Sequence, residues 1–222
     1  MLGMEHSRNT ADEASRYPMH TKNEPSIEDD KRLVQRVLAG DEAAFTALYD
    51  AYAPMLLRRI LRLMGRDDQA EDCLQMVFIE VLERLEHYRG EGALGAWLHR
   101  ITTTTVLQQF RKQKSRSRLA EGFAFFSMFR EEANPLLAER LLFDEERKKM
   151  LYTCLEDIEA DRRMAILLCD IEGKPVEDAA KELHIPLGTL ASRLHRGRQD
   201  LQKSLSRRLK QHGLSVEEWF HG

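Results

Sequence analysis

The stretch that constrains the fold most strongly is Pro175–Leu201, which reads PVEDAAKELHIPLGTLASRLHRGRQDL. Small and apolar residues predict a short helix in its first half, and His184–Pro186 predicts a turn. Gly188 and Thr189 then predict the start of a second, longer helix. This order is typical of a helix-turn-helix, in which the second helix enters the major groove of DNA.

The second helix of this motif should have one buried side and one basic, exposed side. Between Leu187 and Lys210 the sequence has seven Lys or Arg and one acid, Asp200. A face that is merely solvated usually mixes both signs, so this one favours DNA, with a solvated helix in a bundle as the alternative. Leucines at helical spacing mark the buried side: Leu190, Leu194, Leu201 and Leu205. The helical period turns other residues outward: Ala191, Ser192, His195, Arg196 and Gln199.

Composition sets broad limits on the rest of the chain. Its 222 residues are 42% hydrophobic and 32% charged, which is enough for one domain or two small ones. A net charge of −3 leaves a nucleic-acid partner open, because a basic face on a near-neutral protein still attracts phosphate. No run approaches the ~20 apolar residues of a membrane span, and residues 1–25 lack the apolar core of a signal peptide. We therefore expect a cytoplasmic protein with no membrane insertion of its own.

The residues that carry chemistry in enzymes are scattered. The acids are dispersed over predicted helix surfaces, which disfavours a nuclease or another DNA-acting enzyme, since that class needs clustered carboxylates or a nucleophile beside a base. The three cysteines, Cys73, Cys154 and Cys169, form no CxxC pair and predict reduced thiols rather than a disulfide framework or a zinc site. We expect no enzyme activity, no metal and no cofactor.

Helical periodicity runs almost without interruption over residues 27–114 and again over 144–210, and nothing alternates like a strand. We predict an all-α fold of two small helical domains, the second containing the helix-turn-helix. Residues 1–26 are interpreted as a disordered leader, 211–222 as a tail and 115–143 as a flexible linker. Five large apolar side chains in the linker either pack on a domain or form a docking surface: Phe123, Phe125, Phe126, Met128 and Phe129.

Local signals place the helix ends of the first domain. Asp41 predicts an N-cap, Gly65 a C-terminal stop, and Pro54 a helix start or kink. Asp68–Glu71 resembles a capping box. The helix after it, Asp68–Leu85, has an apolar stripe made of Leu74, Val77, Phe78, Val81, Leu82 and Leu85. Its other face carries acids and amides, which suit either solvent or a protein partner but not DNA.

The stretch Trp97–Arg118 has six Lys or Arg and no acid. A helix face of one sign after the aromatic-bearing loop Tyr88–Ala93 suits phosphate contact with base stacking. A basic helix end without a ligand is equally compatible, and Trp97 can serve as a core residue or as a stacking platform.

The order of these parts resembles the extracytoplasmic-function (ECF) group of bacterial sigma factors, from about Asp29 to Leu209. Asp72–Phe78 (DCLQMVF) and Trp97–Ile101 (WLHRI) are similar to the two motifs of that family's first domain. Gly188–Arg198 (GTLASRLHRGR) is similar to its closing motif, which is the more specific of the matches.

The resemblance implies a sigma factor whose partners are core RNA polymerase, promoter DNA and an anti-sigma factor. It implies polymerase binding by Asp72, Gln75, Met76 and Phe78. It implies recognition and melting of the −10 element by Tyr88, Arg89, Trp97, Arg100, Thr104, Gln108, Arg111 and Lys112. It implies recognition of the −35 element by Thr189, Ala191, Ser192, Arg193, His195, Arg196, Arg198 and Gln199. Polymerase would supply the chemistry.

The sequence departs from the family pattern at several of these positions. Met76 stands where the family often has Glu, Ala191 where a basic residue is common, and Glu159 where Pro is frequent. Thr104 and Gln108 replace the usual Asn and Asp, within a run of four threonines that lowers helix propensity. An ordinary helix-turn-helix regulator, and a mimic that titrates an anti-sigma factor, are the alternatives.

Overall fold

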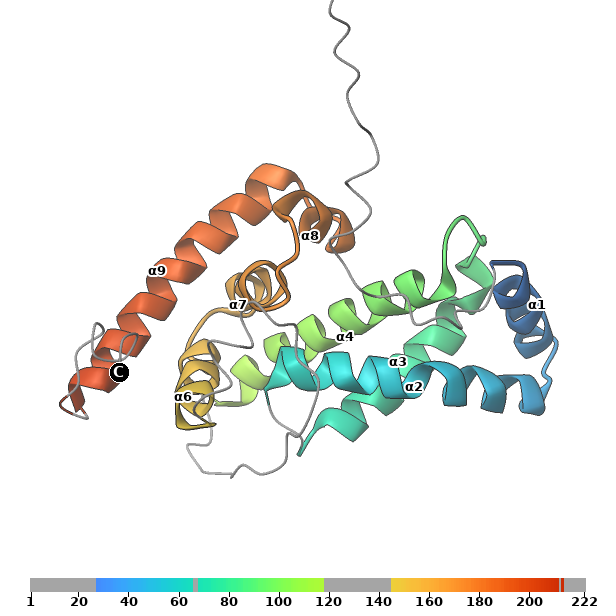
Figure 1. Cartoon of the computed structure of the whole chain (residues 1–222), viewed down its shortest axis with the longest axis horizontal. Helices are drawn as coiled ribbons and strands as arrows, with labels where there is room; N and C mark the ends of the chain where they lie inside the picture. Colours follow the sequence, from blue (N-terminus) through green and yellow to red (C-terminus); the bar gives the residue numbers. More distant parts are fainter. Residues whose placement is uncertain (1–26, 66–67, 118–144, 212, 214–222) are drawn as a thin grey trace, which may run out of the picture.

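The structure, a computed structural model, describes residues 27–65, 68–117, 145–211 and 213. Within these ranges every regular element is a helix, which confirms the predicted all-α class (Figure 1). The first lobe, residues 27–117, contains α1 (Ile27–Leu38), α2 (Glu42–Met64), α3 (Ala70–Arg84), the 3-10 turn η1 (Leu85–His87) and α4 (Leu94–Ser117). The second lobe, residues 145–211, contains α6 (Glu145–Glu156), α7 (Ala160–Ile166), the π-helical turn η2 (Leu167–Ile171), α8 (Val176–Glu182) and α9 (Leu187–Gln211). The predicted leader, the Phe-rich part of the linker and most of the tail lie outside the described residues.

The ends of α2 follow the predicted signals. The Asp41 carboxylate accepts a hydrogen bond from the Ala44 N–H at 3.1 Å and so caps the first turn. Gly65 ends the helix in the left-handed conformation, with φ of 69°. The prediction that Pro54 starts a helix is wrong, because α2 continues through it, and the alternative of a kink at Pro54 stays a prediction.

Two predictions for α3 were wrong in detail. The helix begins one residue later than the predicted capping box requires, because its N-cap is Gln69 rather than Asp68. The Gln69 side chain makes no capping bond, and its carbonyl accepts a hydrogen bond from Gln113 of α4 at 2.5 Å. Leu82 is 45% exposed and does not belong to the buried stripe, because it lies at the edge of that stripe on the side of Gln75 and Ile79.

A buried carboxylate joins three helices of the first lobe. Asp30 of α1 is 2% exposed and accepts hydrogen bonds from the Tyr52 hydroxyl of α2 at 2.8 Å and from the Leu94 N–H at 3.0 Å. Leu94 is the first residue of α4, so Asp30 caps that helix from a distant part of the chain. The contact fixes where α4 begins.

The second lobe contains the predicted helix-turn-helix as α8 and α9. Glu159, at the position where the family often has Pro, caps α7 by accepting hydrogen bonds from the N–H groups of Asp161 and Arg162. α7 crosses α9 closely at Gly197, where a Cβ atom would lie 2.9 Å from the Arg162 carbonyl oxygen. Glycine at this position therefore sets the distance between the two helices.

The two lobes pack against each other, with α7 lying between α4 and α9 (Figure 1). Most of their buried apolar residues form one continuous cluster, whereas Cys154, Leu205 and Leu209 form a second, smaller one within the second lobe. Tyr152 of α6 packs on Gly65 at the end of α2, and its hydroxyl donates to the Arg62 carbonyl at 2.5 Å. The lobes are therefore not independent in this structure.

Candidate functional site

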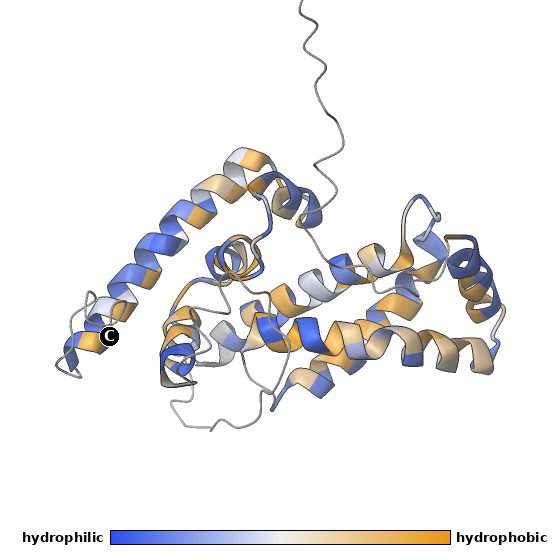
Figure 2. Cartoon of the chain, viewed as in Figure 1, coloured by the Kyte–Doolittle hydropathy of each residue, from blue (hydrophilic) through white to orange (hydrophobic). Residues whose placement is uncertain are grey.

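The side of α9 that the leucine spacing predicts to face outward is accessible to solvent in the structure. Leu190 and Leu194 are buried, whereas Figure 2 shows mainly polar residues over the rest of the helix. Exposed on that side are Ala191, Ser192, His195, Arg196, Arg198 and Gln199, while Thr189 and Arg193 are half-buried. Every residue predicted for this face thus has at least part of its surface accessible.

The cations on this face differ in how they are held. Arg198 makes two hydrogen bonds to the Asp170 carboxylate, at 2.6 and 3.0 Å, and Arg193 lies 3.4 Å from Asp161. Arg196 is exposed and has no ion pair within the part of the chain that the structure describes. Its guanidinium is therefore the most available donor on the recognition side of α9.

The basic helix α4 presents its predicted DNA-facing residues along one side. Arg100, Gln108, Arg111 and Lys112 are exposed, and Thr104 is half-buried. The threonine run is accommodated because its hydroxyls bond to carbonyls of the preceding turn, as for Thr102 to Leu98 at 2.9 Å and Thr104 to Ile101 at 2.9 Å. Arg111 is already paired, since its guanidinium lies 2.6 Å from Asp161 of α7.

The loop before α4 brings two aromatic rings together. The Tyr88 and Trp97 ring centroids lie 5.7 Å apart, and both residues are half-buried against the core. The Tyr88 hydroxyl donates to the Gly92 carbonyl at 2.6 Å, which closes the loop, and burial raises the Tyr88 pKa. Arg89 is exposed on the same loop. Trp97 therefore contributes to the core and keeps an accessible part.

The candidate protein-docking face lies on α3. Asp72 and Gln75 are exposed, and Met76 is half-buried, with its sulfur 3.0 Å from the Gln109 amide nitrogen. Phe78 is only 4% exposed and stacks on Tyr49 at 4.6 Å between ring centroids. Phe78 therefore supports this face from beneath and presents little surface of its own.

Two apolar residues of this face were missed by the sequence reasoning. Ile79 is 57% exposed and Leu82 is 45% exposed. Ile79 follows Gln75 by four residues and Leu82 follows it by seven, so all three lie on one side of the helix. Placing all of α3 on a helical wheel would have separated these two residues from the buried stripe.

The comparisons with known proteins cover both lobes. The Sigma-70 region 2 model matches residues 48–116, and the Sigma-70, region 4 model matches residues 148–201. The ECF RNA polymerase sigma-E factor of Escherichia coli K12 is 30% identical over 183 residues, which cover 79% of this chain and 94% of that protein. The chain belongs to the ECF sigma factors. Its two lobes are accordingly called region 2 and region 4 below.

Two further relatives of this sigma factor are also RNA polymerase sigma factors. ECF RNA polymerase sigma factor SigE of Mycolicibacterium smegmatis is 34% identical over 171 residues, which cover 76% of this chain and 65% of that protein. The RNA polymerase sigma-H factor of Pseudomonas aeruginosa is 30% identical over 188 residues, covering 83% and 97%. Among solved structures, the Bartonella quintana sigma factor RpoE in complex with the anti-sigma factor NepR has 24% identity and a TM-score of 0.49, covering 72% of this chain and 96% of that one.

The described residues include no group of three or more His, Cys, Asp or Glu side chains that could hold a metal ion. The three cysteines are free, and burial raises the pKa of Cys73 to about 11. No helix in the described ranges is long and apolar enough to cross a membrane.

Proposed function

We propose that this sigma factor binds core RNA polymerase through α3 and directs it to promoters through α4 and α9. Region 2 would span residues 27–114 and region 4 residues 144–210, with an anti-sigma factor as a further partner, as the family resemblance implies. Its place of action would be the cytoplasm, where bacterial DNA is transcribed. The observation that carries the proposal is the pairing of a cationic recognition face on α9 with a separate, non-basic docking face on α3.

The docking face on α3 combines apolar and polar groups that suit a protein partner. Ile79 and Leu82 expose apolar surface next to the Gln75 amide and the Asp72 carboxylate. Burying exposed apolar surface favours association, and polar groups around it give orientation. The acids of α3 would repel DNA, so polymerase is the better occupant.

The upstream element would be read by α9. Arg196 can donate two hydrogen bonds to a guanine edge, and the exposed Gln199 amide can pair with adenine. Arg193 and Arg198 are held by carboxylates and are better placed for phosphate than for a base edge. Ser192, Thr189, His195 and Ala191 would complete the contact.

The downstream element would be bound by α4 and the loop before it. Arg100, Lys112 and Arg111 would contact phosphates, and Thr104 and Gln108 lie between them on the helix. The accessible parts of Trp97 and Tyr88, with Arg89 beside them, would receive an unstacked base of the melted strand.

Transcription in vitro with core polymerase tests the proposal. We expect start sites only when the protein is added, and co-purification of the protein with core polymerase. An ordinary regulator would instead bind duplex DNA specifically without polymerase. An anti-sigma-titrating mimic would start no transcription on any template.

A further inference from the structure

A lysine of α1 lies across the loop that precedes α4. Gly90 of that loop has φ of 66°, and a Cβ atom placed there would collide with Cε of Lys31 and lie 2.9 and 3.0 Å from its Cγ and Cδ. The side-chain carbons of Lys31 therefore cover the bare Cα of Gly90, and any larger residue at position 90 would displace them. The Lys31 ammonium is one bond beyond Cε, so it lies at the same loop.

The residue before Lys31 fixes the position of α1 at this loop. Asp30 is buried, and its two carboxylate oxygens accept hydrogen bonds from the Tyr52 hydroxyl and from the Leu94 N–H that begins α4. α1 also packs on η1, the turn that leads into the loop. Since α1 contacts the chain on both sides of the loop, these contacts determine where the Lys31 ammonium lies.

No carboxylate of the described structure neutralises the Lys31 charge. Lys31 makes no ion pair within residues 27–65, 68–117, 145–211 and 213, whereas its neighbour Arg32 lies 4.0 Å from Glu28 of the same helix. The loop itself carries one cation and one acid, Arg89 and Glu91, and both are exposed. Lys31 therefore leaves the accessible groups at the loop with one positive charge in excess.

The proposed function requires positive charge at this loop. The rings of Tyr88 and Trp97, with centroids 5.7 Å apart, lie on either side of it and keep accessible surface. A base that stacks there brings its backbone phosphates with it. Proteins that bind single-stranded DNA combine such aromatic stacking with cations along the backbone.

We propose that Lys31 is a further DNA-contacting residue of the −10 site, and that its ammonium binds a backbone phosphate next to the unstacked base. The inference rests on the proposed function and adds α1 to the elements that contact DNA. Packing on Gly90 orients the side chain before DNA arrives, so little side-chain freedom remains to be lost on binding. Lys31 acts on the melted strand, and recognition of the −35 element by α9 does not depend on it.

The test uses the holoenzyme, reconstituted from core polymerase and the full chain, and separates charge from packing at position 31. Lys31→Met keeps an unbranched side chain over Gly90 and removes the charge, while Lys31→Arg keeps the charge. Arg32→Met is the matched control, because Arg32 is the adjacent cation of α1 and its side chain is 71% exposed.

The probe is a promoter fragment whose non-template strand is unpaired over the −10 element. Its affinity is measured by fluorescence anisotropy between about 50 and 200 mM KCl, the range over which phosphate contacts change affinity steeply. A fully paired fragment that holds only the −35 element is measured beside it.

We expect Lys31→Met to bind the unpaired fragment more weakly than the wild type. The slope of log affinity against log salt should become shallower by about 0.7, the contribution of one phosphate on a single strand. Lys31→Arg and Arg32→Met should keep the wild-type slope. All four proteins should bind the −35 fragment equally, and permanganate reactivity of thymines in the −10 element of the paired promoter should fall for Lys31→Met alone.

A wild-type affinity and slope in Lys31→Met would overturn the proposal and leave Lys31 as a packing residue of the loop. An equal loss in Arg32→Met would also overturn it, since the effect would then belong to the net charge of α1. If Lys31→Met has lost helical circular dichroism, Lys31→Gln takes its place under the same criteria.

Failure of the proposed function gives a different result. The wild-type holoenzyme would then bind neither fragment and start no transcription, and the inference on Lys31 would be wrong with it. If the inference alone is wrong, the wild-type protein and every variant initiate at the same start sites with the same melting of the −10 element.

Discussion

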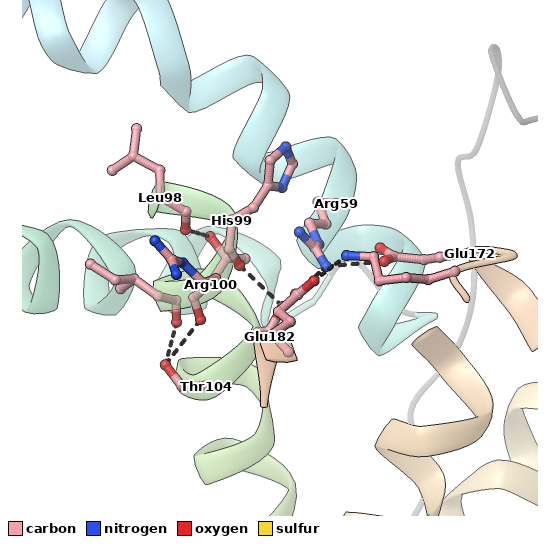
Figure 3. A network of polar contacts seen from close by, with 11 residues as sticks. Arg59, Leu98, His99, Arg100, Thr104, Glu172 and Glu182 are labelled. Carbon is pink, nitrogen blue, oxygen red and sulfur yellow. Dashed lines mark hydrogen bonds and ion pairs between the residues drawn. The ribbon is translucent and has the colours of Figure 1, made fainter. Parts of the chain in front are cut away.

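His99 lies beside a cluster of charges in which Arg59 of region 2 pairs with Glu172 and Glu182 of region 4 (Figure 3). Both ring nitrogens are buried without a hydrogen-bond partner in the described structure. Burial, helped by the positive charges of Arg59, Lys174 and Arg62 and opposed by Glu182, lowers the His99 pKa from 6.5 to about 3. The imidazole is therefore neutral while the regions are packed.

This histidine predicts how stability depends on pH. Below pH 6.5 an unfolded or open chain protonates His99, whereas the packed form does not until about pH 3. Packed-state stability should therefore fall with acidification, by at most about 1.4 kcal/mol per pH unit. Urea unfolding between pH 6.5 and 5 measures the slope, and His99→Leu should reduce it. The exposed His87→Leu is the control, and an unchanged slope in His99→Leu would contradict the argument.

Replacement of Arg196 should change how strongly the protein prefers one −35 sequence over another. Replacing Arg196 by Ala should cost about 1–3 kcal/mol of binding at the −35 element if it reads a base. Core-polymerase binding should be retained, because Arg196 lies on α9 and not on the proposed docking face of α3. Transcription from a set of −35 variants measures the loss. Lys203→Ala, on the exposed side of the same helix, should leave the preference intact, and an equal loss at every sequence would assign Arg196 to phosphate.

At the scale of the element, α3 carries two different surfaces on one helix. Val77 and Val81 face the core, while Ile79 and Leu82 expose apolar surface to solvent. Apolar residues that contribute little to folding are available for a partner. The helix can therefore be tested for docking without unfolding region 2.

Replacing Ile79 and Leu82 together by Ser should weaken binding to core polymerase. The melting temperature should change little, because surface substitutions usually alter stability by less than about 0.5 kcal/mol. Leu38→Ser, at an exposed leucine of α1, is the matched control. Binding is measured by co-purification. Normal polymerase binding by the double variant would show that the docking face does not include Ile79 and Leu82.

Sequence reasoning predicted the elements better than their contacts. The Asp41 cap, the Gly65 stop and the turn between α8 and α9 follow from chemistry within a few residues, so the sequence is sufficient for them. The exposure of Leu82 depends on which side of α3 its neighbours cover. The pairs Arg59–Glu182 and Arg111–Asp161 join residues far apart in the chain, and no local pattern predicts them. The exposure of the candidate DNA-facing residues on α9 could be predicted because one helix carries them all, and their contact with DNA stays a prediction.

At the scale of the whole molecule, Gly65 of region 2 is a point of close packing against Tyr152 of region 4. Its positive φ alone disfavours a side chain, and a Cβ atom there would lie 1.9 Å from the Tyr152 ring of region 4. Gly40 also has positive φ, but its Cβ would meet nothing within 4 Å. A substitution at Gly40 therefore measures backbone strain alone, whereas a substitution at Gly65 measures backbone strain together with packing between the regions.

Gly40→Ala should lower the free energy of unfolding by about 1 kcal/mol, the cost of the left-handed conformation. Gly65→Ala should lose more, because Tyr152 must also move, and should expand the protein in scattering. Urea unfolding and the radius of gyration measure the two effects. Equal losses with unchanged scattering would mean that Tyr152 adapts within the packed state.

The Asp30 carboxylate has a consequence for how the protein is made. It emerges from the ribosome 64 residues before the Leu94 N–H that it caps. Until α4 is synthesised, burying Asp30 would leave much of a charged group unsatisfied, so the nascent α1 and α2 gain little by packing around it. Region 2 should thus form only once α4 is complete. A chain arrested before Leu94 would then be a target for proteases rather than a partial docking surface that occupies polymerase.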